Sequence, residues 1–445
     1  MGQKTLVLRD PAMIKQIMIR DFDHFVNRIH DVQQDRLLNK SVLLLRDQKW
    51  RDMRTMLSPI YTSSKMKYMY GLLADCVEDF VKFYSEKAKS AGGEVEIETH
   101  DVFARITADG IVTTALGFKG DCVRNKDSKI YEMTDEMEAD FTSPTTLTLT
   151  FMFPALFKLL GFQTFRKSVH EFFETNVLNE IQRRRDGKIT RPDVIQLLIQ
   201  AKEGQLKLEA GDAEELSYTE SKIKKISNWT DEDLVAQALI LFLGGFDTTA
   251  TLMQVISFEL ARNLEVQQTL IDEVDEMIEM LDGNSITYEK LNEMKFLDMV
   301  VQETLRKWPS FRATPRYCSK DYVLKDDETG KTYKIKKGTN VFIPFGAIQM
   351  DPKYFPEPEN FDLTRFSDEN KSKIVSGSFL PFGMGPRICI GSRYALLEAK
   401  LLLFNIMTKF TIKKTPKTPE KLTNSFGNSG YLEKIYVAFK LRNFD

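Results

Sequence analysis

The sequence contains little cysteine and histidine for its length. Only four of each occur among 445 residues, and the cysteines are not spaced as pairs, which is typical of a protein from a reducing compartment. The histidines are scattered, with neither a zinc spacing nor a two-histidine-one-carboxylate spacing. Gly-x-Ser-x-Gly and Walker sequences are absent as well. The residues concerned are Cys76, Cys122, Cys318, Cys389, His24, His30, His100 and His170.

An excess of charge of one sign and a long apolar run are also missing. The formal net charge is −2, so nothing indicates a nucleic-acid partner. The longest apolar run, Leu234–Leu243, is half the ~20 residues that a membrane span needs, and it leads into Gly244 and Gly245. No secretory signal is visible. The start at Met1–Leu8 already reads as a strand inside a domain, which predicts an N-terminally truncated copy.

What the chain does have is enough apolar material for a large core. Hydrophobic residues make up 42% and aromatic residues 11% of the sequence, so the length allows either two or three domains or one large helical domain. Periodicity and turn residues predict individual helices and strands along the chain. The expected elements are a strand and helix over Val7–Phe25, a loop over Val26–Arg46, helices over Met66–Lys89, Val102–Leu116 and Ile286–Trp308, a surface loop over Lys202–Ile226, a hairpin over Tyr333–Pro344, a turn over Asn424–Gly430 and a last strand over Ile435–Phe439.

The most informative stretch is Phe382–Gly391. Its glycines predict sharp turns and a close backbone approach, and a helix is expected from Ser392. Cys389 therefore lies just ahead of a helix N-terminus, where free N–H groups favour a thiolate. A thiolate in such a loop is a ligand for a soft metal or for haem iron.

Other interpretations of this stretch compete. Cys389 could be an ordinary buried thiol, or half of a disulfide for which the other cysteines offer no paired spacing. The loop could also open a dinucleotide fingerprint at Gly383-x-Gly385. We reject the fingerprint because Ile388 occupies its third glycine position and Pro386 removes an N–H group that a phosphate would need.

A long helix is predicted from Trp229 to Leu260. Thr230 and Asp233 form a capping box at its start. Two adjacent mid-helix glycines, Gly244 and Gly245, cost about 1 kcal/mol each relative to alanine, and a buried acid such as Asp247 costs more. Such costly residues indicate a functional role for this part of the helix. A flat ligand could approach the backbone at the glycines, and the hydroxyl of the following threonine could bond back to a carbonyl, loosen the helical turn and admit water. A kinked helix without chemistry is the alternative.

Two further pairs share helix faces. Trp50 and Arg54 are four residues apart, as in a cation–π pair. Glu303 and Arg306 are three apart, as in a solvated surface ion pair.

Together these segments resemble the cytochrome P450 family. The cysteine loop matches Phe-x-x-Gly-x-Arg-x-Cys-x-Gly, the central helix matches Gly-Gly-x-Asp-Thr, and the two pairs match Trp-x-x-x-Arg and Glu-x-x-Arg. A downstream arginine, Arg365, completes the last motif, although Leu363-Thr364 replaces the family's Pro-Glu before it. The matches fall in family order from Trp50 to Cys389. The matching residues of the loop and helix are Phe382, Gly385, Arg387, Cys389, Gly391, Gly244, Gly245, Asp247 and Thr248.

The resemblance implies a mainly α fold with minor antiparallel β structure. One large catalytic domain would cover residues 1–445, without the family's membrane anchor and first helix. Haem b would be ligated by the Cys389 thiolate, and Asp247 and Thr248 would organise the water chain that protonates bound dioxygen. The cofactor-binding residues implied are Arg28, Trp50, Arg54, Gly244, Thr248, Arg316, Phe382, Arg387 and Cys389. The substrate-facing residues implied are Leu43, Leu44, Ile240, Leu243, Phe246, Phe311 and Arg312, and the structural ones are Glu303, Arg306 and Arg365.

The activity implied is that of a haem-thiolate monooxygenase. It would insert one oxygen atom of O2 into an apolar xenobiotic, lipid or hormone-like molecule. Electrons would come from NADPH through a flavoprotein reductase, with cytochrome b5 as a second possible donor. The apolar segment Thr142–Phe165 reads either as buried core or as a pocket roof that touches the membrane, and the endoplasmic reticulum surface is the expected location. A haem-thiolate hydroperoxide isomerase and a non-catalytic haem protein are the alternatives; the retained Asp247-Thr248 argues against the isomerase.

Overall fold

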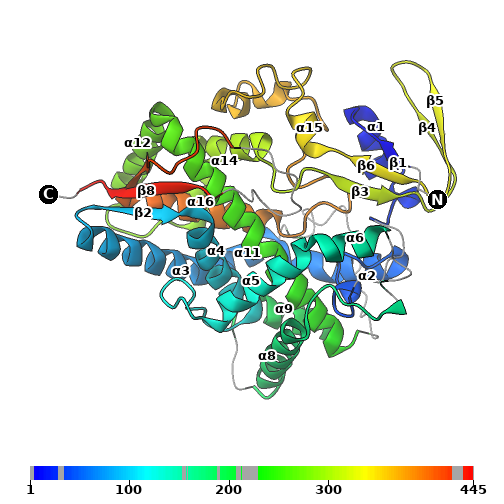
Figure 1. Cartoon of the computed structure of the whole chain (residues 1–445), viewed down its shortest axis with the longest axis horizontal. Helices are drawn as coiled ribbons and strands as arrows, with labels where there is room; N and C mark the ends of the chain where they lie inside the picture. Colours follow the sequence, from blue (N-terminus) through cyan, green and yellow to red (C-terminus); the bar gives the residue numbers. More distant parts are fainter. Residues whose placement is uncertain are drawn as a thin grey trace.

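The computed structural model describes residues 5–28, 35–152, 157, 159–187, 191–206, 212, 229–422 and 434–443. The architecture is mainly helical, as predicted (Figure 1). The helices are α1 (Pro11–Lys15), α2 (Asp47–Leu57), α3 (Ser63–Ser90), α4 (Thr99–Ile111), α5 (Lys129–Thr142), α6 (Pro144–Met152), α8 (Lys167–Arg185), α9 (Val194–Glu203), α11 (Asp231–Arg262), α12 (Leu264–Leu281), α13 (Tyr288–Glu293), α14 (Lys295–Lys307), α15 (Phe345–Gln349) and α16 (Ser392–Lys409).

Short helical turns extend several of these helices. A π-helical turn follows α1 and another follows α4, and 3-10 turns connect neighbouring elements. Their bounds are Gln16–Arg20 and Val112–Leu116 for the π turns, and Phe22–His24, Leu38–Lys40, Ser58–Tyr61, Leu363–Phe366 and Lys371–Lys373 for the 3-10 turns.

The strands form three small sheets at opposite sides of the helical body (Figure 1). One has the order β1-β6-β3, with β1 parallel to β6 and β6 antiparallel to β3; the second is antiparallel with the order β2-β8-β7; the third is the β4-β5 hairpin. The strands are β1 (Thr5–Val7), β2 (Glu94–Glu98), β3 (Thr314–Tyr317), β4 (Tyr322–Lys325), β5 (Thr332–Ile335), β6 (Asn340–Ile343), β7 (Phe410–Lys414) and β8 (Tyr436–Leu441).

The expected hairpin over Tyr333–Pro344 is wrong. Its two halves belong to different sheets, since β5 pairs with β4 whereas β6 pairs with β3 and β1. Gly338, at φ +92°, lets the chain turn between them, and its N–H donates to the Cys318 carbonyl over 2.9 Å. Alternation along a strand specifies which face is buried but not which strand is its partner.

Helix α11 is the central helix and crosses the middle of the molecule (Figure 1). The predicted capping box is confirmed: the Thr230 hydroxyl accepts from Asp233 N over 3.2 Å, and the Asp233 carboxylate accepts from Thr230 N over 2.7 Å. Such a cap contributes about 1 kcal/mol. Helices α4, α8, α14 and α16 pack against α11. Its Gly-Gly pair does not break it, because the helix is continuous over its 32 residues.

Among the described residues, α11 is also the one helix that is long and apolar enough to cross a bilayer. However, 78% of its most apolar window is buried inside the protein, as expected of a core helix. A longer apolar stretch than the sequence predicted therefore exists, and it forms the centre of the core.

Two further expectations concern segments that are described only in part. In the proposed pocket roof, Phe157 and Phe165 are buried, whereas Leu159, Leu160 and Phe162 are exposed, by 82% in the case of Leu159. The segment is thus partly core and partly apolar surface. The turn over Asn424–Gly430 and most of the loop over Lys202–Ile226 lie outside the described residues.

Candidate functional site

The cysteine loop is a tight turn that depends on two glycines. Gly383 and Gly385 have φ values of +76° and +69°, a region that side chains rarely adopt. A Cβ on Gly385 would lie only 1.9 Å from the Met18 carbonyl oxygen. The loop is closed by a hydrogen bond of 2.9 Å from Cys389 N to the Phe382 carbonyl. Helix α16 begins at Ser392, as predicted.

The Cys389 side chain is exposed, although the cysteine loop lies deep within the protein. Burial is the main influence on the thiol and raises its pKa. The Gly391 N–H and the charges of Arg54 and Arg28 lower that pKa, but burial outweighs them. The helix N-terminus therefore does not by itself make a thiolate here; a coordinated cation would, because a metal-bound thiol loses its proton.

Three arginines form a cluster near the cysteine loop: Arg28 and Arg54, whose charges act on Cys389, and Arg316, which the charge of Arg28 reaches. Burial lowers the pKa of each guanidinium, to about 10 for Arg54 and about 9 for Arg316. Each has a buried Nε–H that makes no hydrogen bond to any described residue, and the positive charge of Arg28 further lowers the pKa of the other two. Arg28 donates to the Arg387 carbonyl over 3.4 Å, and Arg316 donates to the Thr314 hydroxyl and the Pro315 carbonyl over 3.1 and 2.9 Å, but no described carboxylate acts on any of the three. Buried cations without a counter-charge are costly. The cluster therefore fits an anionic group such as the two haem propionates.

Arg387, from the same loop, has different partners. Its guanidinium donates to the carbonyls of Val26, Val42, Leu43 and Leu45 over 2.7–3.4 Å. These bonds take up most of its N–H donors. The structure thus shows Arg387 fixing the 42–45 turn, whereas the cofactor-binding role that the resemblance implies for it stays a prediction.

The cation partner of Trp50 also differs from the expected one. The Arg387 guanidinium carbon lies 4.2 Å from the centroid of the Trp50 ring, whereas the four-residue spacing alone suggested a cation–π pair of Trp50 with Arg54. The indole is buried, with 3% of its surface exposed, and packs against Phe22 at 5.6 Å between ring centroids. Trp50 therefore supports the cysteine loop directly.

On α11 the two glycines have different surroundings. Gly244 is exposed within a mostly buried stretch of α11, and nothing lies within 4 Å of a Cβ placed on it. A Cβ on Gly245 would lie 2.6 Å from Ile111 Cδ1. Only Gly244 thus leaves room for a flat ligand, whereas Gly245 allows α4 to pack closely. The Thr248 hydroxyl donates to the Gly244 carbonyl over 2.8 Å and shares the open face with it.

Asp247 points to another side of α11. Its Oδ1 lies 3.5 Å from His100 Nε2 on α4, and it lines a cavity of about 10 Å³ together with Glu138 of α5. Burial alone would lower the pKa of His100, but the bond to Asp247 and the charges of Glu138 and Glu98 raise it to about 9. Sequence analysis missed His100 and Glu138, since they are distant in sequence from Asp247 and belong to no linear motif.

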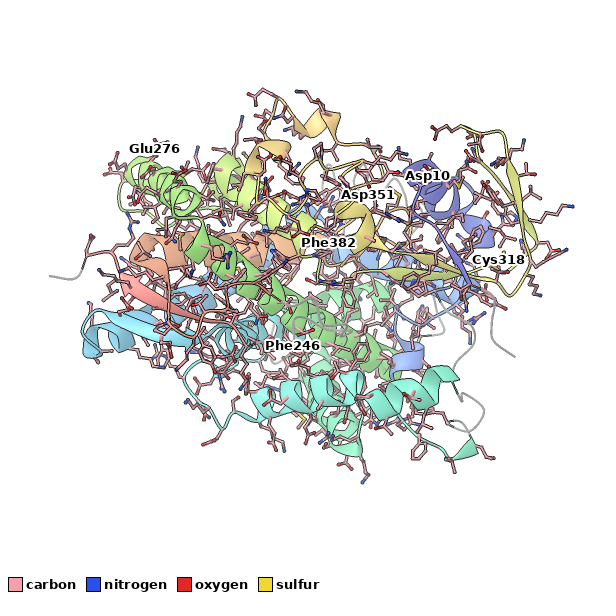
Figure 2. The ribbon with its side chains drawn as sticks, turned by 45° about the horizontal axis from the view of Figure 1, so that its top comes forward. Asp10, Phe246, Glu276, Cys318, Asp351 and Phe382 are labelled. Atoms are coloured by element: carbon pink, nitrogen blue, oxygen red, sulfur yellow. The ribbon has the colours of Figure 1, made fainter. Side chains whose placement is uncertain are left out.

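The residues expected near a substrate separate into two groups. Ile240 lies one turn before Gly244 on the same face of α11, while Leu243 and Phe246 line the cavity beside Asp247. Figure 2 shows Phe246 on α11 near the centre of the molecule, with Phe382 of the cysteine loop above it in that view. Leu43 and Leu44 are half-buried in the turn that Arg387 holds.

The segment before β3 approaches the open face of α11. The Ser310 hydroxyl donates to the Thr248 carbonyl over 3.3 Å. Phe311, which follows, is 49% exposed, and Arg312 is half-buried with its carbonyl bonded to Gly346 N. This contact brings Phe311 and Arg312 towards Thr248.

The Glu-x-x-Arg pair is buried rather than solvated. Glu303 and Arg306 are both 0% exposed and joined by two hydrogen bonds of 2.7 and 2.8 Å. Arg306 also donates to the Pro358 and Asn360 carbonyls, and Arg365 Nε lies 3.6 Å from the Glu303 carboxylate. Glu303, Arg306 and Arg365 thus attach the chain from Pro358 to Arg365 to α14. This chain leads towards the cysteine loop.

Comparisons with known proteins agree with this geometry. The family described as cytochrome P450 matches residues 1–435. The chain is 39% identical over 430 residues to cytochrome P450 9e2 of Blattella germanica, covering 93% of this chain and 79% of the relative. It is 35% identical to cytochrome P450 9b1 of Drosophila melanogaster (94% and 80% covered) and 31% identical to cytochrome P450 6A1 of Musca domestica (99% and 85% covered). The chain therefore belongs to the cytochrome P450 family and is a haem-dependent monooxygenase.

Proposed function

We propose that this monooxygenase inserts one oxygen atom of O2 into an apolar xenobiotic, lipid or hormone-like molecule, with Cys389 as the axial ligand of its haem. The observation that carries the proposal is the group of Arg28, Arg54 and Arg316, whose Nε–H groups are buried without a hydrogen bond to a described residue. The charges of Arg28 and Arg54 act on the Cys389 thiol, and the charge of Arg28 acts on Arg316. A cluster of three cations requires an anionic partner, and the two propionates of haem would supply that charge.

When bound, haem supplies the oxygen-activating chemistry, which a thiolate ligand assists by donating electron density. The chain's own residues bind and orient. Arg28, Arg54 and Arg316 would hold the propionates, and Arg387 and Trp50 would keep the loop of Cys389 and the 42–45 turn in register. Phe382 and Gly244 would allow the flat ring to lie between the cysteine loop and α11.

Proton delivery is assigned to α11. The Thr248 hydroxyl lies on the open face of the helix and could hold a water near the reacting oxygen while it donates to the Gly244 carbonyl. The Asp247 carboxylate, on the next residue, lies beside His100 and Glu138. Since consecutive helix residues point about 100° apart, Asp247 and Thr248 would connect two adjacent faces of α11 and pass a proton from one to the other.

The substrate pocket would be lined by apolar side chains from three segments. Leu43 and Leu44, Ile240 on α11, and Phe311 before β3 favour an apolar molecule, and Arg312 would select a polar or anionic group at one end. NADPH would supply electrons through a flavoprotein reductase, with cytochrome b5 as a second donor. The exposed Leu159, Leu160 and Phe162 suit contact with the endoplasmic reticulum surface.

The test is the Cys389→Ser variant of the haem-loaded protein. It should lose both monooxygenase activity and the red-shifted absorption of the reduced carbon monoxide complex, because an alcohol is a much poorer donor than a thiolate. A variant that retains both would refute the ligand assignment.

Turnover conditions separate the competing activities. The monooxygenase requires NADPH and a reductase, whereas a hydroperoxide isomerase turns over with hydroperoxide alone. NADPH consumption that depends on a bound molecule but gives no oxygenated product would indicate a non-catalytic haem protein.

A further inference from the structure

A second group of ligand-type side chains lies beside α11, on the flank that faces the start of α4 and the end of α5. His100 at the start of α4, Glu138 near the end of α5 and Asp247 in the middle of α11 each offer one ligand atom, and these atoms all lie within 4.8 Å of one another. We propose that His100, Glu138 and Asp247 form a binding site for one divalent transition-metal ion, for which Zn²⁺ is the best match.

The donor set and its spacing suit zinc. Imidazole nitrogen and carboxylate oxygen bind Zn²⁺ at about 2.0–2.2 Å, so two tetrahedral ligands lie about 3.4 Å apart. His100 Nε2 and Asp247 Oδ1 are already 3.5 Å apart. Since no pair in the set exceeds 4.8 Å, Glu138 completes the set with a side-chain movement of about 1.4 Å or less. Three protein ligands plus water is a common zinc coordination.

The Asp247 carboxylate is poorly satisfied. Asp247 is 9% exposed, and its buried Oδ1 has, among the described residues, only the 3.5 Å contact with His100 Nε2, which is too long for a good hydrogen bond. Such an oxygen is costly unless a proton donor or a cation satisfies it. Glu138 and Asp247 line a cavity of about 10 Å³ with Leu243 and Phe246, which is about the space of one small ion or water.

The surrounding charge also favours a cation. The negative charge of Glu98 raises the pKa of His100, and the negative charge of Asp135 raises the pKa of Glu138. Glu98 holds its position by accepting hydrogen bonds from the His100 and Asp101 amides over 2.9 and 3.2 Å. The three ligands come from three packed helices, so the site is built on rigid elements.

Zinc bound there would occupy the Asp247 carboxylate. It should slow turnover that depends on proton delivery through Asp247, a consequence that rests on the proposed function. Zinc binding itself does not depend on the proposed function, so the two proposals can fail separately. Zinc binding without inhibition of turnover would count only against proton delivery through Asp247.

The test measures zinc directly on the full, haem-loaded chain, by equilibrium dialysis with elemental analysis and by zinc K-edge X-ray absorption. The wild type should bind one equivalent with an imidazole and oxygen shell near 2.0–2.1 Å. His100→Gln and Glu138→Gln should each weaken that binding by at least about tenfold. Glu132→Gln, an exposed carboxylate on the same helix as Glu138, is the matched control and should bind as the wild type does.

Either of two results overturns the proposal. Equal zinc binding by the wild type and both ligand variants would mean adventitious surface binding only. No bound zinc in the wild type would mean that His100 and Asp247 form an ion pair and nothing more. If His100→Gln does not fold, Glu138→Gln still decides the test. Glu138 is half-buried, and glutamine has nearly the same shape, so this substitution should leave the fold intact.

Discussion

The Arg387 guanidinium stacks on the Trp50 ring at 4.2 Å and donates to four backbone carbonyls on the far side of the cysteine loop. Lysine would keep the charge but cannot make this planar, multidentate set of bonds. Arg387→Lys should therefore destabilise the protein by about 3 kcal/mol, as expected for losing two charged hydrogen bonds. Chemical unfolding followed by circular dichroism measures the change.

A smaller effect is expected from the ring side of the same contact. Trp50→Phe keeps an aromatic face and should cost about 1 kcal/mol through a weaker cation–π contact. Arg20→Lys, at an exposed pair with Asp21, is the control and should change nothing measurable. If Arg387→Lys behaved like Arg20→Lys, the carbonyl bonds would not hold the loop.

This contact shows where sequence reasoning stops. The motif around Cys389 predicted the tight cysteine loop and the start of α16 because glycine conformation and helix periodicity are local properties. It could not assign Arg387 its partners, since the carbonyls of Val26 and of the 42–45 turn come from a segment more than three hundred residues earlier. The spacing of Glu303 and Arg306 could not predict that the pair is buried, for the same reason. Solvated and buried pairs have the same spacing, and only tertiary packing decides between them; the structural role came from the family resemblance.

The two glycines of α11 allow a matched pair of substitutions. Gly244→Ala adds a methyl group where nothing lies within 4 Å, so it should stabilise the haem-free protein by up to about 1 kcal/mol through helix propensity. It should also weaken haem or substrate binding, because it fills the open face. Haem transfer to a scavenger protein and spectral titration measure these effects.

Gly245→Ala should have the opposite effect on stability. Its methyl group would lie 2.6 and 2.7 Å from two carbons of Ile111, so α4 would have to move, at a cost typical of overpacking, about 1–3 kcal/mol. Adding Ile111→Val removes the nearer carbon and should recover part of the loss. Equal effects of the two glycine substitutions would contradict the different surroundings described for them.

The Glu303–Arg306 pair predicts a large loss when one partner is neutralised. Glu303→Gln leaves a fully buried Arg306 without its counter-charge, which should cost about 3–5 kcal/mol. Asp368→Asn removes an exposed partner of Lys295 and Lys371 and should leave stability unchanged. Thermal unfolding of both variants against the wild type separates a buried lock from a surface pair; similar small shifts would contradict the first.

A last prediction concerns acid stability at the start of α11. The Arg185 guanidinium donates two hydrogen bonds to Asp231, of 2.8 and 2.9 Å, and Lys202 a third of 2.7 Å; Arg185 foremost lowers the pKa of Asp231 to about 2. Because this pKa is depressed below the unfolded value, the carboxylate stabilises the fold above about pH 4, and the contribution disappears as the pH falls towards 2.

Wild type and Asp231→Asn should therefore differ in unfolding free energy by about 1 kcal/mol at neutral pH, since a side chain that is one third exposed is partly screened. The difference should stay constant down to about pH 4.5 and shrink below it. Asp79→Asn, an exposed carboxylate on α3, should show no such pH dependence. A difference that grew on acidification would mean that Asp231 is protonated more readily in the folded protein than in the unfolded chain, and that the bridge between α8, α9 and α11 does not form.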